Sequence, residues 1–172
     1  MGLDFEALAA QKDDLVHEYR KKKYESLVDG DIRIEKGHVQ FVDPHVVKVN
    51  GKQLSGDKVL VATGSRPVLP EIQGLDRVAH LTSDLLTVDE PIALRLLPRS
   101  LLIAGGGYIA LELGQMFSRF GAEVTILERS PQLLAHGYEP EVGRSIGDVF
   151  AQEGMVALSR FKDPAKLSCC AE

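Results

Sequence analysis

Closely spaced glycines near the middle of the chain could hold the phosphates of a nucleotide. The stretch GGGYIA over residues 105–110 fits the pattern G-x-G-x-x-A. In this pattern Gly105 permits a tight turn, Gly107 lets the backbone approach a pyrophosphate, and the small Ala110 lets a helix and a strand pack closely. The first N–H groups of the following helix and the positive end of its dipole would then bind the phosphates. The alternative is a glycine-rich turn that only connects two elements.

An acidic residue lies at the spacing that a ribose-binding carboxylate requires. Glu128 ends an apolar run at about 20 residues beyond the glycine turn. A carboxylate there accepts hydrogen bonds from a ribose diol and repels a 2′-phosphate, whereas the neighbouring Arg129 could attract one. The position of Glu128 therefore favours NADH, and Arg129 leaves NADPH open.

Two adjacent cysteines, Cys169 and Cys170, lie near the C-terminal end of the sequence and are its only cysteines. Neighbouring Cα atoms are about 3.8 Å apart, whereas a relaxed disulfide requires about 4.4–6.8 Å. We therefore expect two free thiols, which are soft ligands that favour soft metal ions. The alternative is a pair of exposed cysteines without a role.

The elements around the glycine turn are predicted from hydrophobic patterning. A short apolar run over 100–104 precedes the glycines, a helical pattern follows them as far as Phe120, and a second apolar strand covers 124–127. This order predicts a parallel, partial Rossmann-like β-α-β nucleotide-binding unit. A further helix is predicted from Pro140, a good first-turn residue, to Gln152.

A long helix and a small antiparallel meander are predicted upstream. Residues 4–28 contain no Gly or Pro and place Leu8, Leu15, Val16 and Tyr19 at helical spacing, which predicts one amphipathic helix. Alternating patterns around 32–34, 39–41 and 47–49 then predict three strands. The Asn50-Gly51 pair predicts a two-residue hairpin turn. Lys58 to Ala62 is expected to continue as an apolar strand.

The string GGGYIALELG over 105–114, preceded by VLVATGSRP over 59–67, resembles the pyridine-nucleotide disulfide oxidoreductases. The resemblance implies that Ala62, Thr63 and Gly64 lie beside FAD at the end of a flavin domain. It also implies that Tyr108 covers the nicotinamide pocket and that Glu112 lies by the nicotinamide. The alternatives are a core aromatic for Tyr108, a solvated helix residue for Glu112 and a simple strand end for 62–64.

The C-terminal stretch over residues 161–172 resembles the tail of mercuric reductases, the branch of this family that reduces Hg(II). In that branch the tail cysteines, here Cys169 and Cys170, capture Hg(II) and pass it to redox cysteines of the partner subunit. The family's FAD-binding glycine motif, its C-x-x-x-x-C redox pair and its dimerisation domain find no match in this sequence. We therefore expect an internally shortened chain that jumps to the tail near Glu153-Gly154.

The resemblance divides the chain into four expected parts. Residues 1–70 are a remnant of the FAD domain, 71–99 a connector, 100–154 the first half of the NAD(P)-binding domain and 155–172 the Cys-Cys tail. The intact enzyme would pass hydride from NAD(P)H through FAD to Hg(II). We expect this shortened chain to bind Hg(II) and nucleotide, without a redox pair for catalysis. The alternatives are a non-catalytic mercury-binding protein or a fragment of another disulfide reductase.

Composition limits the partners of the protein. The net charge of −5 provides no basic field for nucleic acid. The sequence shows no secretory signal and no apolar run of about 18 residues that could span a bilayer. We therefore expect a cytoplasmic protein with no nucleic-acid or membrane partner. The intact family forms homodimers.

Overall fold

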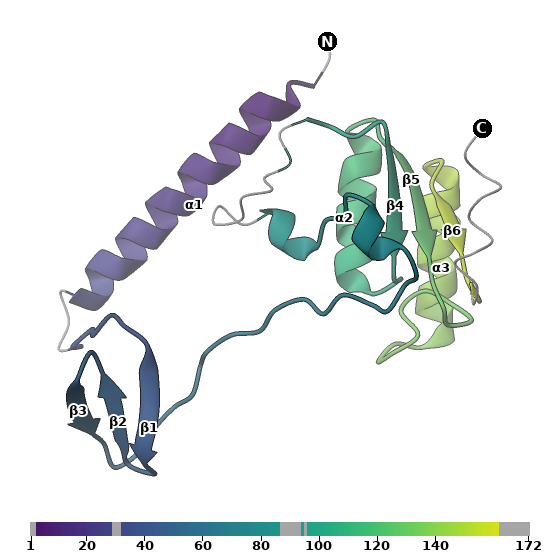
Figure 1. The fold of residues 1–172 in the computed structure, drawn as a ribbon. Helices are drawn as coiled ribbons and strands as arrows, with labels where there is room; N and C mark the ends of the chain where they lie inside the picture. The colour runs from purple at the N-terminus through teal and green to yellow at the C-terminus, as the bar shows by residue number, and fades with distance from the viewer. Residues whose placement is uncertain (1–2, 29–31, 87–93, 95, 162–172) are drawn as a thin grey trace. The chain divides into compact units, whose positions relative to one another are not determined.

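The computed structural model describes residues 3–28, 32–86, 94 and 96–161 (Figure 1). The chain forms two compact units, one made of residues 3–11 with 69–161 and the other of residues 12–68. The first unit holds a parallel sheet and the second an antiparallel sheet. The protein therefore has the mixed α/β fold that its sequence predicts.

The long N-terminal helix is confirmed as α1, which covers Phe5–Val28. It begins where the Asp4 carboxylate accepts a hydrogen bond from the Ala7 N–H at 3.0 Å, as an N-cap residue does. None of the residues in α1 is buried, so its apolar residues form no buried face. Leu15 is 51% exposed and Tyr19 is 65% exposed. Helical spacing puts apolar residues on one face, but only packing against another element buries that face.

The antiparallel meander is confirmed, with strands β1 (Val39–Asp43), β2 (Val46–Val49) and β3 (Lys52–Ser55) in that order. Asn50 and Gly51 join β2 to β3 with φ angles of 49° and 84°. Two positive φ angles match the two-residue hairpin turn that an Asn-Gly pair favours.

Two expected strands are absent from the structure. Residues 32–34 lie outside the sheet, and β3 takes the third place because a two-residue turn brings it beside β2 at little entropic cost. Lys58 to Ala62 is not a strand either, and Leu60 is 90% exposed there. Its apolar sequence suits a strand, but no described residue pairs with it.

The β-α-β unit is confirmed as β4 (Ser100–Ala104), α2 (Tyr108–Arg119) and β5 (Glu123–Leu127). The following helix α3 (Pro140–Gln152) has its predicted bounds. A third parallel strand, β6 (Val156–Leu158), pairs with β5 and was not predicted. Its three residues are all exposed, and so short a run carries little pattern of its own. Two short 3₁₀ helices, η1 (Leu75–Arg77) and η2 (Ser83–Leu86), precede the unit.

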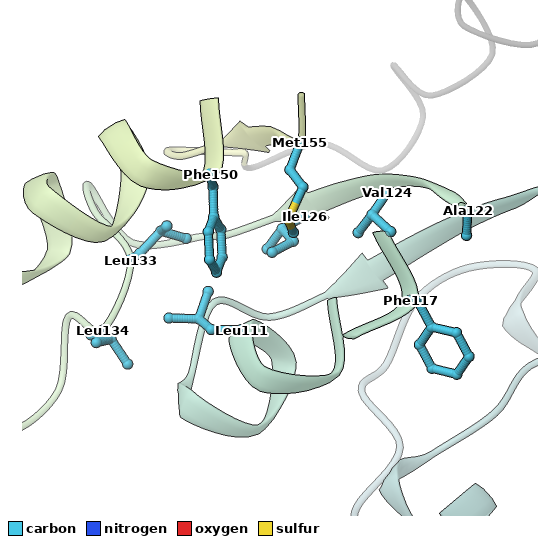
Figure 2. Close-up of a cluster of buried hydrophobic side chains, with 9 residues drawn as sticks. All are labelled: Leu111, Phe117, Ala122, Val124, Ile126, Leu133, Leu134, Phe150 and Met155. Carbon is cyan, nitrogen blue, oxygen red and sulfur yellow. The ribbon is translucent and has the colours of Figure 1, made fainter. Parts of the chain in front are cut away.

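The core of this unit lies between the sheet and its two helices (Figure 2). Phe150 and Met155 point toward Leu111 and Ile126, the latter at the centre of the sheet (Figure 2). The buried residues that form the cluster are Leu111, Phe117, Ala122, Val124, Ile126, Leu133, Leu134, Phe150 and Met155. Phe5 joins the cluster, with its ring centroid 6.1 Å from that of Phe117.

The two helices of the unit are also linked by a polar contact. Glu153, which follows α3, accepts hydrogen bonds from Arg119 at 2.6 Å and from Gln115 at 3.0 Å, both on α2. The hydrogen bond from Arg119 and then that from Gln115 lower the pKa of Glu153.

No helix among the described residues is long and apolar enough to cross a bilayer.

Candidate nucleotide-binding site

The candidate site is the turn that connects β4 to α2. Gly105 extends the hydrogen bonding between β4 and β5, because its N–H donates to the Leu127 carbonyl at 2.8 Å. The chain then turns at Gly105 with a φ of 112°, a conformation that L residues with a side chain rarely adopt. The first predicted glycine therefore lies where the backbone geometry requires a glycine.

Gly107 is the N-cap residue of α2, with φ −80° and ψ 171°. No heavy atom outside its chain neighbours lies within 4 Å of the position that a Cβ on Gly107 would occupy. The space beside Gly107 is open, and the N–H groups of the first turn of α2 begin there. Such a helix start can accept an anionic group close to the backbone.

Gly106 has a different environment from its two neighbours. A Cβ on Gly106 would lie 2.8 Å from Leu133 Cδ2 and 2.9 Å from Glu128 Oε2. Those distances are shorter than van der Waals contact, so a side chain at this position would displace the ends of the Leu133 and Glu128 side chains. The pattern G-x-G-x-x-A allows any residue type at position 106, so the sequence carried no sign of this close contact.

Glu128 binds two backbone donors at the end of β5. Its Oε2 accepts the Gly106 N–H at 2.6 Å, and its Oε1 accepts the Ser130 N–H at 2.5 Å. Partial burial raises the pKa of Glu128, but the hydrogen bonds from Ser130 and Gly106, together with nearby His136, outweigh that effect and lower it. The carboxylate is therefore held in its charged form beside the turn.

A segment between β5 and α3 also contacts the turn. The Leu134 N–H donates to the Gly106 carbonyl at 2.9 Å. Ser130, whose N–H donates to Glu128, and Leu134, whose N–H donates to Gly106, were not among the predicted site residues, because these donors are backbone groups. Side-chain type carries no signal for such contacts.

The close approach of helix and sheet occurs at Gly114. A Cβ there would lie 3.2 Å from Ile103 Cδ1 and 3.3 Å from Ile126 Cδ1, whereas Ala110, predicted for this role, is only partly buried. Gly114 is four residues after Ala110, one helical turn further along the same face. Gly114 therefore makes a close helix–strand contact one turn beyond Ala110.

The remaining predicted nucleotide residues are exposed. Tyr108 is the first residue of α2 and is 59% exposed, which excludes the alternative of a core aromatic. Glu112 and Arg129 are exposed as well.

The predicted flavin residues lie in the other unit, and the predicted metal residues lie outside the described part of the chain. Ala62, Thr63 and Gly64 belong to the other unit, where they are exposed in a segment without helix or strand. The described part of the chain holds no cluster of three or more His, Cys, Asp or Glu residues that could bind a metal ion. Cys169 and Cys170 lie outside the described residues.

Comparisons with known proteins place this geometry in context. Residues 4–160 match the family described as Pyridine nucleotide-disulphide oxidoreductase. The chain is 40% identical over 154 residues to a mercuric reductase of Lysinibacillus sphaericus, covering 89% of this chain and 27% of that protein. It is 38% identical over 165 residues to a mercuric reductase of Streptomyces lividans, covering 92% of this chain and 33% of that protein.

Among solved structures, the chain is similar to the HOCl-induced flavoprotein disulfide reductase RclA from Escherichia coli. The TM-score is 0.77 at 29% sequence identity, over 92% of this chain and 36% of that one. The chain thus spans about a quarter to a third of the length of these relatives.

Proposed function

The chain belongs to the pyridine nucleotide-disulphide oxidoreductase family, and we propose that it carries the NAD(P)H pyrophosphate-binding turn of a mercuric reductase-like flavoprotein. The observation that supports the proposal is the open space at Gly107, at the start of a 12-residue helix. A pyrophosphate placed there meets the first N–H groups of α2 and the positive end of its dipole. When bound, the nicotinamide supplies a hydride.

We propose that Glu128 binds the adenosine ribose and favours NADH over NADPH. Its carboxylate is charged and lies next to the turn, as the hydrogen bond to the Gly106 N–H requires. A ribose diol can donate to this carboxylate, whereas a 2′-phosphate would bring a second negative charge against it. Arg129 is exposed beside it and is the residue that would favour NADPH.

The family also implies FAD, which the three residues that the resemblance assigns to it do not suit by themselves. Ala62, Thr63 and Gly64 lie exposed in a segment without regular structure, and Gly64 has open space on its Cβ side. An exposed segment of three small residues encloses no part of a flavin ring. No step of the function proposed for this chain therefore runs through FAD.

We further propose that Cys169 and Cys170 capture Hg(II). The proposal is supported by their adjacency, by the strain that opposes a disulfide between them, and by the 34–40% identity of the chain to mercuric reductases over 89% of its length. Two thiolates satisfy a soft ion that needs only two ligands. Binding displaces thiol protons and therefore strengthens as pH rises.

The nucleotide proposal is tested by titrating NADH against the 172-residue chain and its Gly107→Ala variant. The φ of −80° at Gly107 suits alanine, so the variant should fold, with only the small decrease in the midpoint of thermal unfolding that alanine causes at an N-cap. The added methyl occupies the open space, and the NADH dissociation constant should rise about tenfold or more, which corresponds to about 1.4 kcal/mol. Equal NADH affinity in the two proteins would contradict the proposal.

The capture proposal is tested by titrating Hg(II) against Cys169→Ala, Cys170→Ala and the double variant. Each single variant should retain a weaker one-sulfur site, and the double variant should lose specific binding because the sequence holds no other cysteine. Zn(II) serves as a harder competing ion, which should bind more weakly than Hg(II) to the unsubstituted chain. Undiminished Hg(II) binding in the double variant would eliminate the capture role.

A further inference from the structure

The orientation of the peptide between Gly106 and Gly107 decides where the first donor of the proposed nucleotide site points. The Gly106 carbonyl accepts the Leu134 N–H at 2.9 Å. In a planar trans peptide the carbonyl and the following N–H point in opposite directions, and the described residues contain no cis peptide. The hydrogen bond from Leu134 therefore also sets the direction of the Gly107 N–H.

Leu134 is held in place by its packing. Its φ of 53° is a left-handed conformation that a leucine rarely adopts unless its surroundings impose it. Leu133 and Leu134 are 5% and 7% exposed, and both belong to the core cluster (Figure 2). The Leu133 side chain also lies against Gly106, because a Cβ added there would meet Leu133 Cδ2 at 2.8 Å. Side chain and backbone of this segment thus both contact the middle glycine of the turn.

The other side of this segment lies on α3, at a glycine. Gly143 is buried, and a Cβ added to it would overlap the Leu133 carbonyl oxygen. Glycine inside a helix is unfavourable relative to alanine, so its presence here calls for a local reason. The close approach of the Leu133 backbone is such a reason. Gly147, one turn later in the same helix, has no heavy atom within 4 Å of its Cβ position.

We infer that Gly143 is a positioning residue for the nucleotide turn. Its missing side chain lets the Leu133–Leu134 backbone lie against α3. From that position Leu134 holds the Gly106 carbonyl and thereby directs the Gly107 N–H. The inference rests on the proposed function in one respect, that the Gly107 N–H faces the pyrophosphate.

Two alanine variants in the same helix test the inference, since they make the same chemical change in different surroundings. In Gly143→Ala the new methyl must displace the Leu133 backbone, and Gly147→Ala is the matched control with open space. The backbone amide resonance of Gly107 should shift in Gly143→Ala and remain in place in Gly147→Ala. NADH affinity should fall about five- to tenfold in Gly143→Ala, the scale of one lost hydrogen bond, and change less than about twofold in Gly147→Ala.

The outcomes separate this inference from the proposed function. A Gly107 resonance that is the same in both folded variants overturns the positioning role, whether or not NADH binds. Absence of NADH binding by the unsubstituted chain overturns the proposed function, while a Gly107 shift confined to Gly143→Ala still supports positioning. If Gly143→Ala does not fold, amide exchange in the unsubstituted chain decides. Bound NADH should slow exchange of the Leu134 amide, and an unchanged exchange rate overturns the inference.

Discussion

At the scale of single residues, the three consecutive glycines of the turn differ in what a side chain at each position would meet. Gly105 needs a positive φ of 112°, and a Cβ on Gly106 would displace the ends of the Leu133 and Glu128 side chains. Gly107 meets neither restriction and has open space instead. Gly107 is therefore the glycine of the turn whose missing side chain the fold itself does not require.

Glu128 should make the stability of the unit depend on pH. Its pKa is lower in the folded chain than its usual value of 4.5, so its contribution is fully present above about that value and is lost as pH falls through the folded pKa. Glu128→Gln places an amide against one of two backbone donors. It should lower the midpoint of thermal unfolding at pH 7, and the difference from the unsubstituted chain should shrink toward pH 3.

Glu112→Gln is the matched control for this prediction, since Glu112 is exposed on α2. Its midpoint should follow that of the unsubstituted chain across the same pH range. A difference between Glu128→Gln and the unsubstituted chain that is as large at pH 3 as at pH 7 would rule out the charged hydrogen bonds as its cause.

At the scale of elements, α2 is the part that connects the core to the turn. Phe117 is 1% exposed and packs against the ring of Phe5 from the start of α1. Gly114 lets the same helix approach Ile103 and Ile126 on the sheet. Packing at Gly114 and Phe117 therefore fixes the position of α2, and with it the N-terminal end of α2 at the turn.

Phe117→Ala should destabilise the unit by about 3–5 kcal/mol, because it removes a fully buried aromatic ring and leaves a cavity. Leu102→Ala on β4 is the control, since Leu102 is 52% exposed and its loss should cost less than about 1 kcal/mol. Urea denaturation followed by circular dichroism measures both. Equal destabilisation by the two variants would show that the unit is not organised around the cluster in Figure 2.

At the scale of the whole molecule, the chain matches its family over residues 4–160 but spans only 27% of the mercuric reductase of Lysinibacillus sphaericus. Within the described residues, the parallel sheet has three strands, with β5 paired on both sides. The third strand, β6, extends the parallel sheet past Gly154, into residues that were expected to belong to the tail.

A protein of these 172 residues should not oxidise NAD(P)H in response to Hg(II), even with added FAD. Its two cysteines are adjacent, so it holds no C-x-x-x-x-C pair to carry electrons from a flavin to the metal. The decrease of absorbance at 340 nm, the usual measure of NAD(P)H, should not depend on Hg(II). Steady Hg(II)-dependent consumption by purified protein, under conditions in which a full-length mercuric reductase is active, would overturn this prediction.

The sequence by itself determined the elements whose signals are local. The Asn50-Gly51 hairpin follows from the preference of those two residues for positive φ, and the start of α3 follows from Pro140. The turn over 105–107 follows from its glycines between an apolar strand and a helical pattern. Each of these signals acts within a few residues, so it can be read before the chain is folded.

Only the tertiary structure decided which apolar segments find partners and which backbone groups meet. The apolar segment 58–62 remained unpaired among the described residues, while the exposed β6 became a strand because β5 offered it an edge. The Ser130 N–H donates to Glu128 and the Leu134 N–H to Gly106, and such backbone donors are common to every residue type except proline. Such contacts form only when distant segments come together. Pairing and burial depend on two segments, whereas the pattern of side chains along the sequence describes one segment at a time.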